Sequence, residues 1–92
     1  MIRNFKHKGL ERLYLSGSTK GINPAHARRI IVRIETLDAL DSLEDLPSEW
    51  KCHPLYKELE GFYAIRLSGA WRIIFRFEEG TVFDVDYVQY HG

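Results

Sequence analysis

The spacing of apolar residues changes near residue 61, and this change constrains the fold more than any other feature. Beyond it, apolar side chains recur at every second position in three runs, FYAIRL, WRIIFRFE and TVFDVDY, as they do in half-buried β-strands. The connectors SGA and EEG are short and contain glycine, as hairpin loops do. The last third of the chain therefore predicts an antiparallel meander with one aromatic face under the helices and one face that carries arginines.

Alternation also assigns side chains to the two faces of this predicted sheet. The helix-covered face is expected to hold Trp71, Ile73, Phe75, Phe77, Phe83, Val85 and Tyr87. The other face is expected to hold Arg72 and Arg76 on one strand and Asp84 and Asp86 on the next. Arginines on a strand can bind a ligand, or they can simply pair with acids across the strands.

Helical spacing marks two segments of the N-terminal half. GLERLYLSG predicts a short helix with Leu10, Leu13 and Tyr14 on one face and Gly17 as its stop. A second helix is expected after the cap residue Asn23, with Pro24 in its first turn. Its apolar stripe is Ala27, Ile30, Ile31, Ile34 and Leu37, and its basic stripe is His26, Arg29 and Arg33. With MIRNF as a short first strand, the fold class is α+β: a short N-terminal strand and two helices packed on a small antiparallel sheet.

Charge is segregated along the chain although the net charge is zero. Residues 1–33 carry eight basic side chains and one acid, whereas residues 34–60 carry eight acids and two basic side chains. Such polarity suits a surface that meets a polyanion, although ordinary solvated faces can also segregate in this way.

Length and composition exclude several classes of protein. Ninety-two residues predict one domain, residues 1–92, and no apolar run is long enough to span a membrane. The single cysteine, Cys52, rules out an internal disulfide framework and indicates a reducing, cytoplasmic location.

Two histidines stand where they could act in catalysis. His53 lies two residues after Lys51 in the segment WKCHPLYKELEG, and His91 comes directly after Tyr90 at the end of VDYVQYHG. Cleavage of RNA needs a base and an acid near neutral pH, which two histidines can supply, and guanidinium groups can stabilise the phosphate without a metal. Arg66, Arg72 and Arg76 are the candidate cations, and Trp50, Tyr56 and Tyr90 are candidates to stack on bases.

Plainer interpretations of the same residues remain open. A histidine before a proline is often a polar turn residue, and Tyr90 and His91 could be the incidental end of an edge strand. His7 and His26 are expected at the surface. Cys52 lacks the second ligand of a zinc site, so no metal or other cofactor is expected.

The segments FKHKGL, KCHPLYKELEGFYAIRLSGAWRIIFRF and DYVQYH together resemble the HigB-type branch of the RelE/ParE toxin superfamily, in the same order and over essentially the whole chain. The resemblance implies a toxin that cuts messenger RNA in the A site of the 70S ribosome. It also implies a helix-turn-helix, HigA-like antitoxin, with operator DNA bound only by the toxin–antitoxin complex and no membrane partner.

The resemblance further implies which residues form the site. By position, His53, Tyr90, His91 and Arg72 are the expected catalytic residues. The charged side chains around them, together with the amide beside Tyr90, give the expected RNA-binding residues: Lys51, Lys57, Arg66, Arg76 and Gln89. This branch commonly has an acid where Gln89 stands, and an amide cannot take a proton. Two alternatives remain open: a ParE-like inhibitor of DNA gyrase, and a non-enzymatic interaction module that has lost catalysis.

Overall fold

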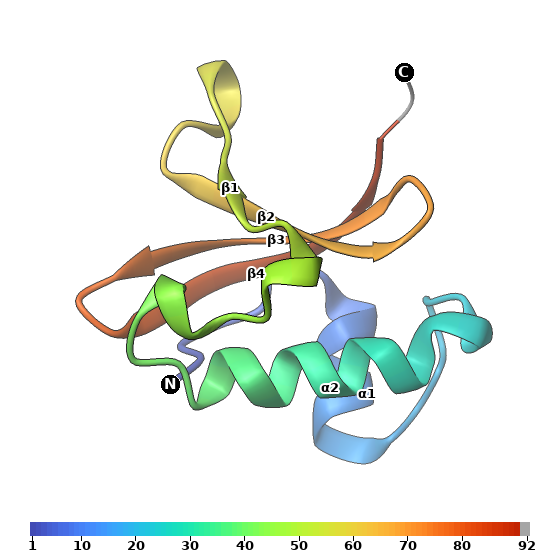
Figure 1. Cartoon of the computed structure of the whole chain (residues 1–92). Helices are drawn as coiled ribbons and strands as arrows, with labels where there is room; N and C mark the ends of the chain where they lie inside the picture. The colour runs from blue at the N-terminus through green and yellow to red at the C-terminus, as the bar shows by residue number, and fades with distance from the viewer. Residues whose placement is uncertain (91–92) are drawn as a thin grey trace.

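The computed structural model describes residues 1–90, in which two helices pack on one face of a four-stranded antiparallel sheet (Figure 1). The sheet order β1-β2-β3-β4 follows the chain. The helices are α1 (Lys8–Ser16) and α2 (Ala27–Asp38), and the strands are β1 (His53–Pro54), β2 (Phe62–Ser68), β3 (Trp71–Glu78) and β4 (Thr81–Gln89). Single 3-10 turns are η1 (Pro24–His26), η2 (Leu43–Asp45), η3 (Ser48–Trp50) and η4 (Lys57–Leu59). Within residues 1–90, no helix has the length and apolar character that crossing a bilayer requires.

Side-chain caps mark the start of both helical segments, and a glycine marks the end of α1. His7 Nδ1 accepts the backbone N–H groups of Gly9 and Leu10 at 3.1 and 3.3 Å, which caps α1. Gly17 ends α1 at φ 75°, where its N–H bonds the Leu13 carbonyl. Asn23 Oδ1 accepts the Ala25 N–H at 3.0 Å and opens η1, which runs directly into α2. The two predicted helices and the predicted Asn23 cap are thereby confirmed.

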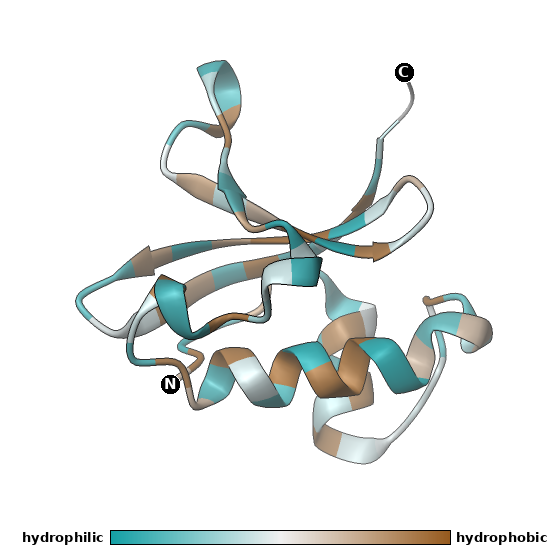
Figure 2. Ribbon diagram, in the orientation of Figure 1, coloured by the Kyte–Doolittle hydropathy of each residue, from teal (hydrophilic) through white to brown (hydrophobic). Residues whose placement is uncertain are grey.

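The core lies between the helices and the sheet. Its fully buried side chains include Leu10, Ile30, Ile34, Leu37, Ile65, Ile73, Phe75, Val82 and Val85. Along the strands of the sheet, hydrophobic and hydrophilic residues alternate (Figure 2). Tyr14 and Ile31 were expected on the buried faces, but they are 41% and 38% exposed because they lie at the outer seam between α1 and α2.

A β-bulge at Asp84 shifts the alternation of β4. Ile74 pairs with Asp86, whereas Arg76 pairs with Phe83, so Phe75 faces two residues of β4 instead of one. Asp84 has the positive φ of 53° that accommodates the extra residue. The prediction that Phe83 enters the core is therefore wrong. Val82 takes that place, and the Phe83 ring lies under the guanidinium of Arg76 at 5.2 Å.

The N-terminal segment runs beside β4, but it forms two isolated parallel bridges instead of the predicted strand. Ile2 bridges to Val82 and Phe5 to Val85. The bulge at Asp84 interrupts the ladder between these two bridges. There the Asn4 side chain takes over: its Oδ1 accepts the Asp84 N–H at 3.1 Å, and its Nδ2 donates to the Asp84 carboxylate at 2.6 Å.

Candidate functional site

The sheet face away from the helices, called here the open face, gathers several of the predicted site residues. Side chains of paired residues on neighbouring strands point to the same face. One row across the four strands is His53, Ala64, Ile74 and Asp86, and the next row is Arg66, Arg72 and Val88. The register thus places His53, Arg66 and Arg72 on one surface, as the alternation of the sequence predicts for the arginines.

His53 is exposed at the edge of the sheet and held by its own backbone neighbourhood. Its Nδ1 lies 2.9 Å from the carbonyl oxygen of Lys51. Because a carbonyl can only accept a hydrogen bond, Nδ1 carries the proton in this contact, and Nε2 of the neutral ring keeps its lone pair. The arrangement therefore presents a proton acceptor to solvent on the open face.

Arg72 and Tyr90 meet where β3 begins and β4 ends. The Tyr90 N–H donates to the Ala70 carbonyl at 2.9 Å, which fixes this tyrosine beside the β2–β3 turn. Nη1 of Arg72 donates to the carbonyls of Gly69 and Trp71 at 2.6 and 2.9 Å, and its guanidinium carbon lies 5.7 Å from the Tyr90 ring centroid. Burial raises the pKa of Tyr90, with Arg72 opposing this effect, so the phenol is neutral at pH 7.

The cationic side chains near His53 are exposed. Lys51, Lys57 and Arg66 all lie at the surface, and both lysines have positive φ angles, 52° and 59°. Tyr56, on the loop after β1, is 71% exposed. These residues form a basic rim with one aromatic side chain at the β1 edge of the open face.

Two other predicted RNA-binding residues have different surroundings. Arg76 makes ion pairs with Asp84 at 2.9 Å and Glu78 at 3.0 Å, so two carboxylates offset its charge. The hydrogen bond from Asn4 and then that from Arg76 lower the pKa of Asp84. Gln89 is exposed and pairs with Trp71, a residue of the helix-covered face. His91, the remaining predicted catalytic residue, lies outside the described residues.

Two expectations about aromatic and histidine side chains are wrong. Trp50 is only 8% exposed, because it packs into the core and the guanidinium of Arg33 covers its ring, so it cannot stack on a base. His26 is 6% exposed, not a surface residue, and its Nδ1 lies 2.6 Å from the Tyr87 hydroxyl. The helical stripe placed His26 outside, but it belongs to the η1 turn, whose different twist directs it toward Trp71 and Tyr87.

Neither Cys52 nor a group of metal ligands adds a reactive centre to the surroundings of His53 in the described part of the chain. Cys52 is half-buried, and burial raises the pKa of its thiol, which disfavours the nucleophilic thiolate. Over the part of the chain that the structure describes, no three His, Cys, Asp or Glu side chains are grouped as ion ligands would be.

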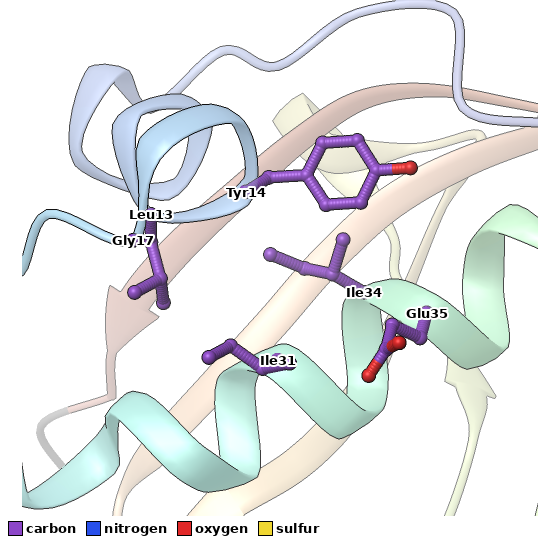
Figure 3. A pocket seen from close by; sticks show the side chains of 6 residues that line it. All are labelled: Leu13, Tyr14, Gly17, Ile31, Ile34 and Glu35. Atoms are coloured by element: carbon purple, nitrogen blue, oxygen red, sulfur yellow. The ribbon is translucent and has the colours of Figure 1, made fainter.

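A cavity of about 290 Å³ lies between α1 and α2, far from these residues. Figure 3 shows its lining: Leu13, Tyr14, Gly17, Ile31, Ile34 and Glu35. All six belong to α1, its end or α2, whereas the predicted site residues among residues 1–90 lie in β1–β4 and in the segments next to these strands. The cavity is therefore separate from the open face.

Comparisons with known proteins identify the family of the chain. A family model described as the RelE-like toxin of the type II toxin-antitoxin system HigB matches residues 3–91. The chain is 36% identical over 92 residues to "Endoribonuclease HigB" of Proteus vulgaris, covering 99% of this chain and 100% of that one.

Solved structures share the fold at low identity. A mutant form of YafQ from E. coli matches with a TM-score of 0.64 and 13% identity, covering 96% of this chain and 88% of the other. A chain of the YoeB-YefM complex from Staphylococcus aureus matches with a TM-score of 0.57 and 19% identity, covering 100% and 97%. These matches confirm the predicted α+β, RelE-like fold. The match of residues 3–91 to the family model and the 36% identity to the relative lead to one conclusion: the chain belongs to the HigB-like family of RelE-like toxins of type II toxin–antitoxin systems.

Proposed function

We propose that this chain is a ribosome-dependent endoribonuclease that cuts messenger RNA in the ribosomal A site, with the open face as its RNA-cleaving surface. Membership of the HigB-like family and 36% identity to an endoribonuclease support the reaction class: the chain is an endoribonuclease toxin of a type II toxin–antitoxin system. The observation that carries the proposal is the bond of His53 to the Lys51 carbonyl, which leaves Nε2 as a proton acceptor on the same sheet face as the exposed Arg66 and the half-buried Arg72.

His53 is assigned as the general base. Its Nε2 takes the proton of the substrate 2′-hydroxyl as that oxygen attacks the adjacent phosphorus. The bond from phosphorus to the 5′-oxygen then breaks, and His91, next after Tyr90 in the sequence, is assigned as the acid that protonates the departing oxygen. The products are a 2′,3′-cyclic phosphate and a 5′-hydroxyl, and the nucleophile comes from the RNA itself.

Arg72 is assigned to the negative charge that develops on the phosphate. Two of the five guanidinium N–H donors are used by the carbonyls of Gly69 and Trp71, which fix the orientation of the group before substrate arrives. The others are the donors that we assign to the phosphate oxygens, because prearranged donors stabilise a transition state without reorganising. The neutral phenol of Tyr90 lies beside this guanidinium and can donate to the same phosphate.

Partners and remaining contacts follow from the same proposal. Lys51, Lys57 and Arg66 would hold the sugar-phosphate chain, and Tyr56 can stack on a base. Arg76 and Gln89 stay predicted RNA contacts, and their surroundings support that role less well. The antitoxin is expected to be a helix-turn-helix, HigA-like protein that binds operator DNA with the toxin, and the site of action is cytoplasmic.

The test is to express the chain without an antitoxin and map new 5′ ends on cellular mRNA. We expect translation and growth to stop, with cuts in frame. On programmed ribosomes, the toxin should cut unmodified mRNA. It should leave intact an mRNA that has a 2′-deoxy nucleotide at the scissile position. Cleavage of that blocked mRNA would contradict the mechanism, and intact mRNA with broken DNA would indicate gyrase inhibition instead.

A further inference from the structure

We propose that Arg33 and Trp50 are positioning residues that hold His53 in its active tautomer, instead of contacting RNA. The inference rests on the proposed function, because it assumes that His53 acts in cleavage. The guanidinium of Arg33 covers the Trp50 ring. The next residue along the chain, Lys51, offers its carbonyl to His53, so a series of contacts runs from α2 to the open face.

The series begins at Arg33 in the middle of α2. Its Nε donates to the Arg66 carbonyl at 2.7 Å, and its Nη1 donates to the Arg29 carbonyl at 3.2 Å. Its guanidinium carbon lies 4.5 Å from the ring centroid of Trp50. Burial, followed by the charge of Arg29, lowers the pKa of Arg33, yet no carboxylate pairs with it among the described salt bridges. Arg33 therefore connects α2, β2 and η3.

Trp50 continues the series at the end of η3. It is buried in the core cluster, and the Lys51 N–H closes η3 on the Ser48 carbonyl at 3.1 Å. Lys51 has the left-handed φ of 52°, which is unfavourable for a residue with a Cβ. This conformation directs the Lys51 carbonyl to His53 Nδ1 at 2.9 Å. Packing of Trp50 under Arg33 is what holds the costly conformation in place.

Loss of this support has a defined chemical consequence. If Lys51 relaxes to an extended conformation, its carbonyl turns away and His53 Nδ1 loses its acceptor. The neutral ring is then free to carry its proton on Nε2, where it cannot accept another. A small displacement of a catalytic group can lower a rate by about 10²-fold. The main effect falls on the chemical step, because Lys57 and Arg66 of the basic rim stay in place and only Lys51 changes its conformation.

Arg29 provides a matched control one helical turn away. It is exposed, it donates to the Ser68 hydroxyl at 3.3 Å, and the Arg33 bond uses only its backbone carbonyl. Arg29 and Arg33 lie on the same stripe and have the same charge. If the stripe simply attracted RNA, equivalent changes at the two positions would weaken binding alike.

The decisive variant is Arg33→Lys, which keeps the positive charge but loses the planar group over Trp50 and the Nε donor. Single-turnover cleavage on programmed ribosomes measures rate and affinity separately, and 15N chemical shifts of the His53 ring report its tautomer. We expect Arg33→Lys and Trp50→Ala to shift the tautomer toward Nε2–H and to lower the cleavage rate by roughly 10- to 10²-fold, with unchanged affinity. Trp50→Phe should retain most activity, and Arg29→Lys should match the parent.

The result that overturns the inference is an Arg33→Lys variant with the parent tautomer and the parent cleavage rate. Equal losses of RNA affinity in Arg33→Lys and Arg29→Lys would overturn it too, since both arginines would then contact RNA. If Trp50→Ala fails to fold, Arg33→Lys and Trp50→Phe suffice to decide. A separate result would remove the proposed function itself: His53→Ala cutting at the parent rate, whatever the tautomer data show.

Discussion

The three histidines that the structure describes have three different roles, each set by a hydrogen bond to one nitrogen. His7 Nδ1 accepts backbone N–H groups and caps α1, His26 Nδ1 meets a tyrosine hydroxyl in the core, and His53 Nδ1 donates to a carbonyl. Of these three histidines, the sequence singled out only His53 as a candidate catalytic residue. Contacts that span 61 residues, such as that from His26 to Tyr87, cannot be predicted from local periodicity.

His53→Ala tests the base directly. We expect cleavage on programmed ribosomes to fall by about 10²–10⁴-fold, the usual contribution of one general base. Stability should stay near that of the parent because the side chain is exposed and its one bond is to a neighbouring carbonyl. Circular dichroism and thermal melting provide the control, and a large loss of folded protein would make the activity loss uninformative about catalysis.

His26 predicts a pH dependence of stability. Burial, with a contribution from Arg29, lowers its pKa below 6.5 in the folded chain. Between that lowered value and about pH 6.5 the unfolded chain binds more protons, so stability decreases as the pH falls through this window. Urea unfolding at pH 7.5 and 5.5 should show the decrease, and His26→Gln should reduce the difference between the two pH values. An equal difference in both proteins would contradict the assignment.

At the scale of elements, β4 shows where the alternation of apolar and polar residues no longer predicts which face of the sheet a side chain lies on. The pattern TVFDVDY alternates correctly from Val85 to Tyr87, and both are buried as predicted. The bulge at Asp84 inverts the assignment before it, so Val82 replaces Phe83 in the core. The pattern of apolar residues does not reveal that Asp84 adopts a positive φ. That conformation depends on hydrogen bonds to Asn4, which is distant in the sequence, and to Arg76 on β3.

Asn4→Ala should loosen the N-terminal segment from β4. The variant removes the bond to the Asp84 N–H at 3.1 Å and the bond to its carboxylate, which together predict a loss of about 1–3 kcal/mol in the free energy of unfolding. Hydrogen exchange of the Val82 and Val85 amides should accelerate, since both donate to this segment. Arg3→Ala, on an exposed neighbour, is the control and should have little effect.

Gly9→Ala tests the close approach between the start of α1 and the loop before α2. Alanine usually stabilises a helix relative to glycine by about 1 kcal/mol. Here a Cβ would lie 2.8 Å from His7 Cε1 and 3.1 Å from the Gly21 carbonyl oxygen. We therefore expect destabilisation of about 1–3 kcal/mol in chemical unfolding. Leu15→Ala, at an exposed position of the same helix, should change stability little, and a more stable Gly9→Ala would contradict the packing.

At the scale of the whole molecule, the sequence predicted the order of the main elements and the two layers. Long periodic runs carry that information, because burying one face of each run leaves few arrangements. The sequence did not predict that the basic stripe of α2 is divided, with Arg33 inserted over Trp50 and Arg29 at the surface. That division arises from contacts between α2, η3 and β2, which no single segment encodes.

The basic rim predicts a salt dependence of RNA binding. Replacing Lys51, Lys57 and Arg66 together by glutamine should weaken binding to single-stranded RNA and lower the slope of log affinity against log salt by about 2, since each phosphate contact contributes about 0.7. Fluorescence anisotropy at several salt concentrations measures this slope. The same change at Arg76 should alter the slope less, because two carboxylates already offset that charge. An equal change of slope in the Arg76 variant would contradict the assignment of RNA binding to the basic rim.

The two margins of the sheet have a consequence for self-association. At one margin, β1 has only two residues, and Pro54 has no N–H to offer a neighbouring strand. At the other margin, the N-terminal segment covers the beginning of β4, and Asp86 Oδ1 accepts the outward Tyr87 N–H at 2.9 Å. Both features limit the pairing of these two margins with strands from another copy. Removing that cover from β4 would therefore provide a starting point for amyloid-like stacking.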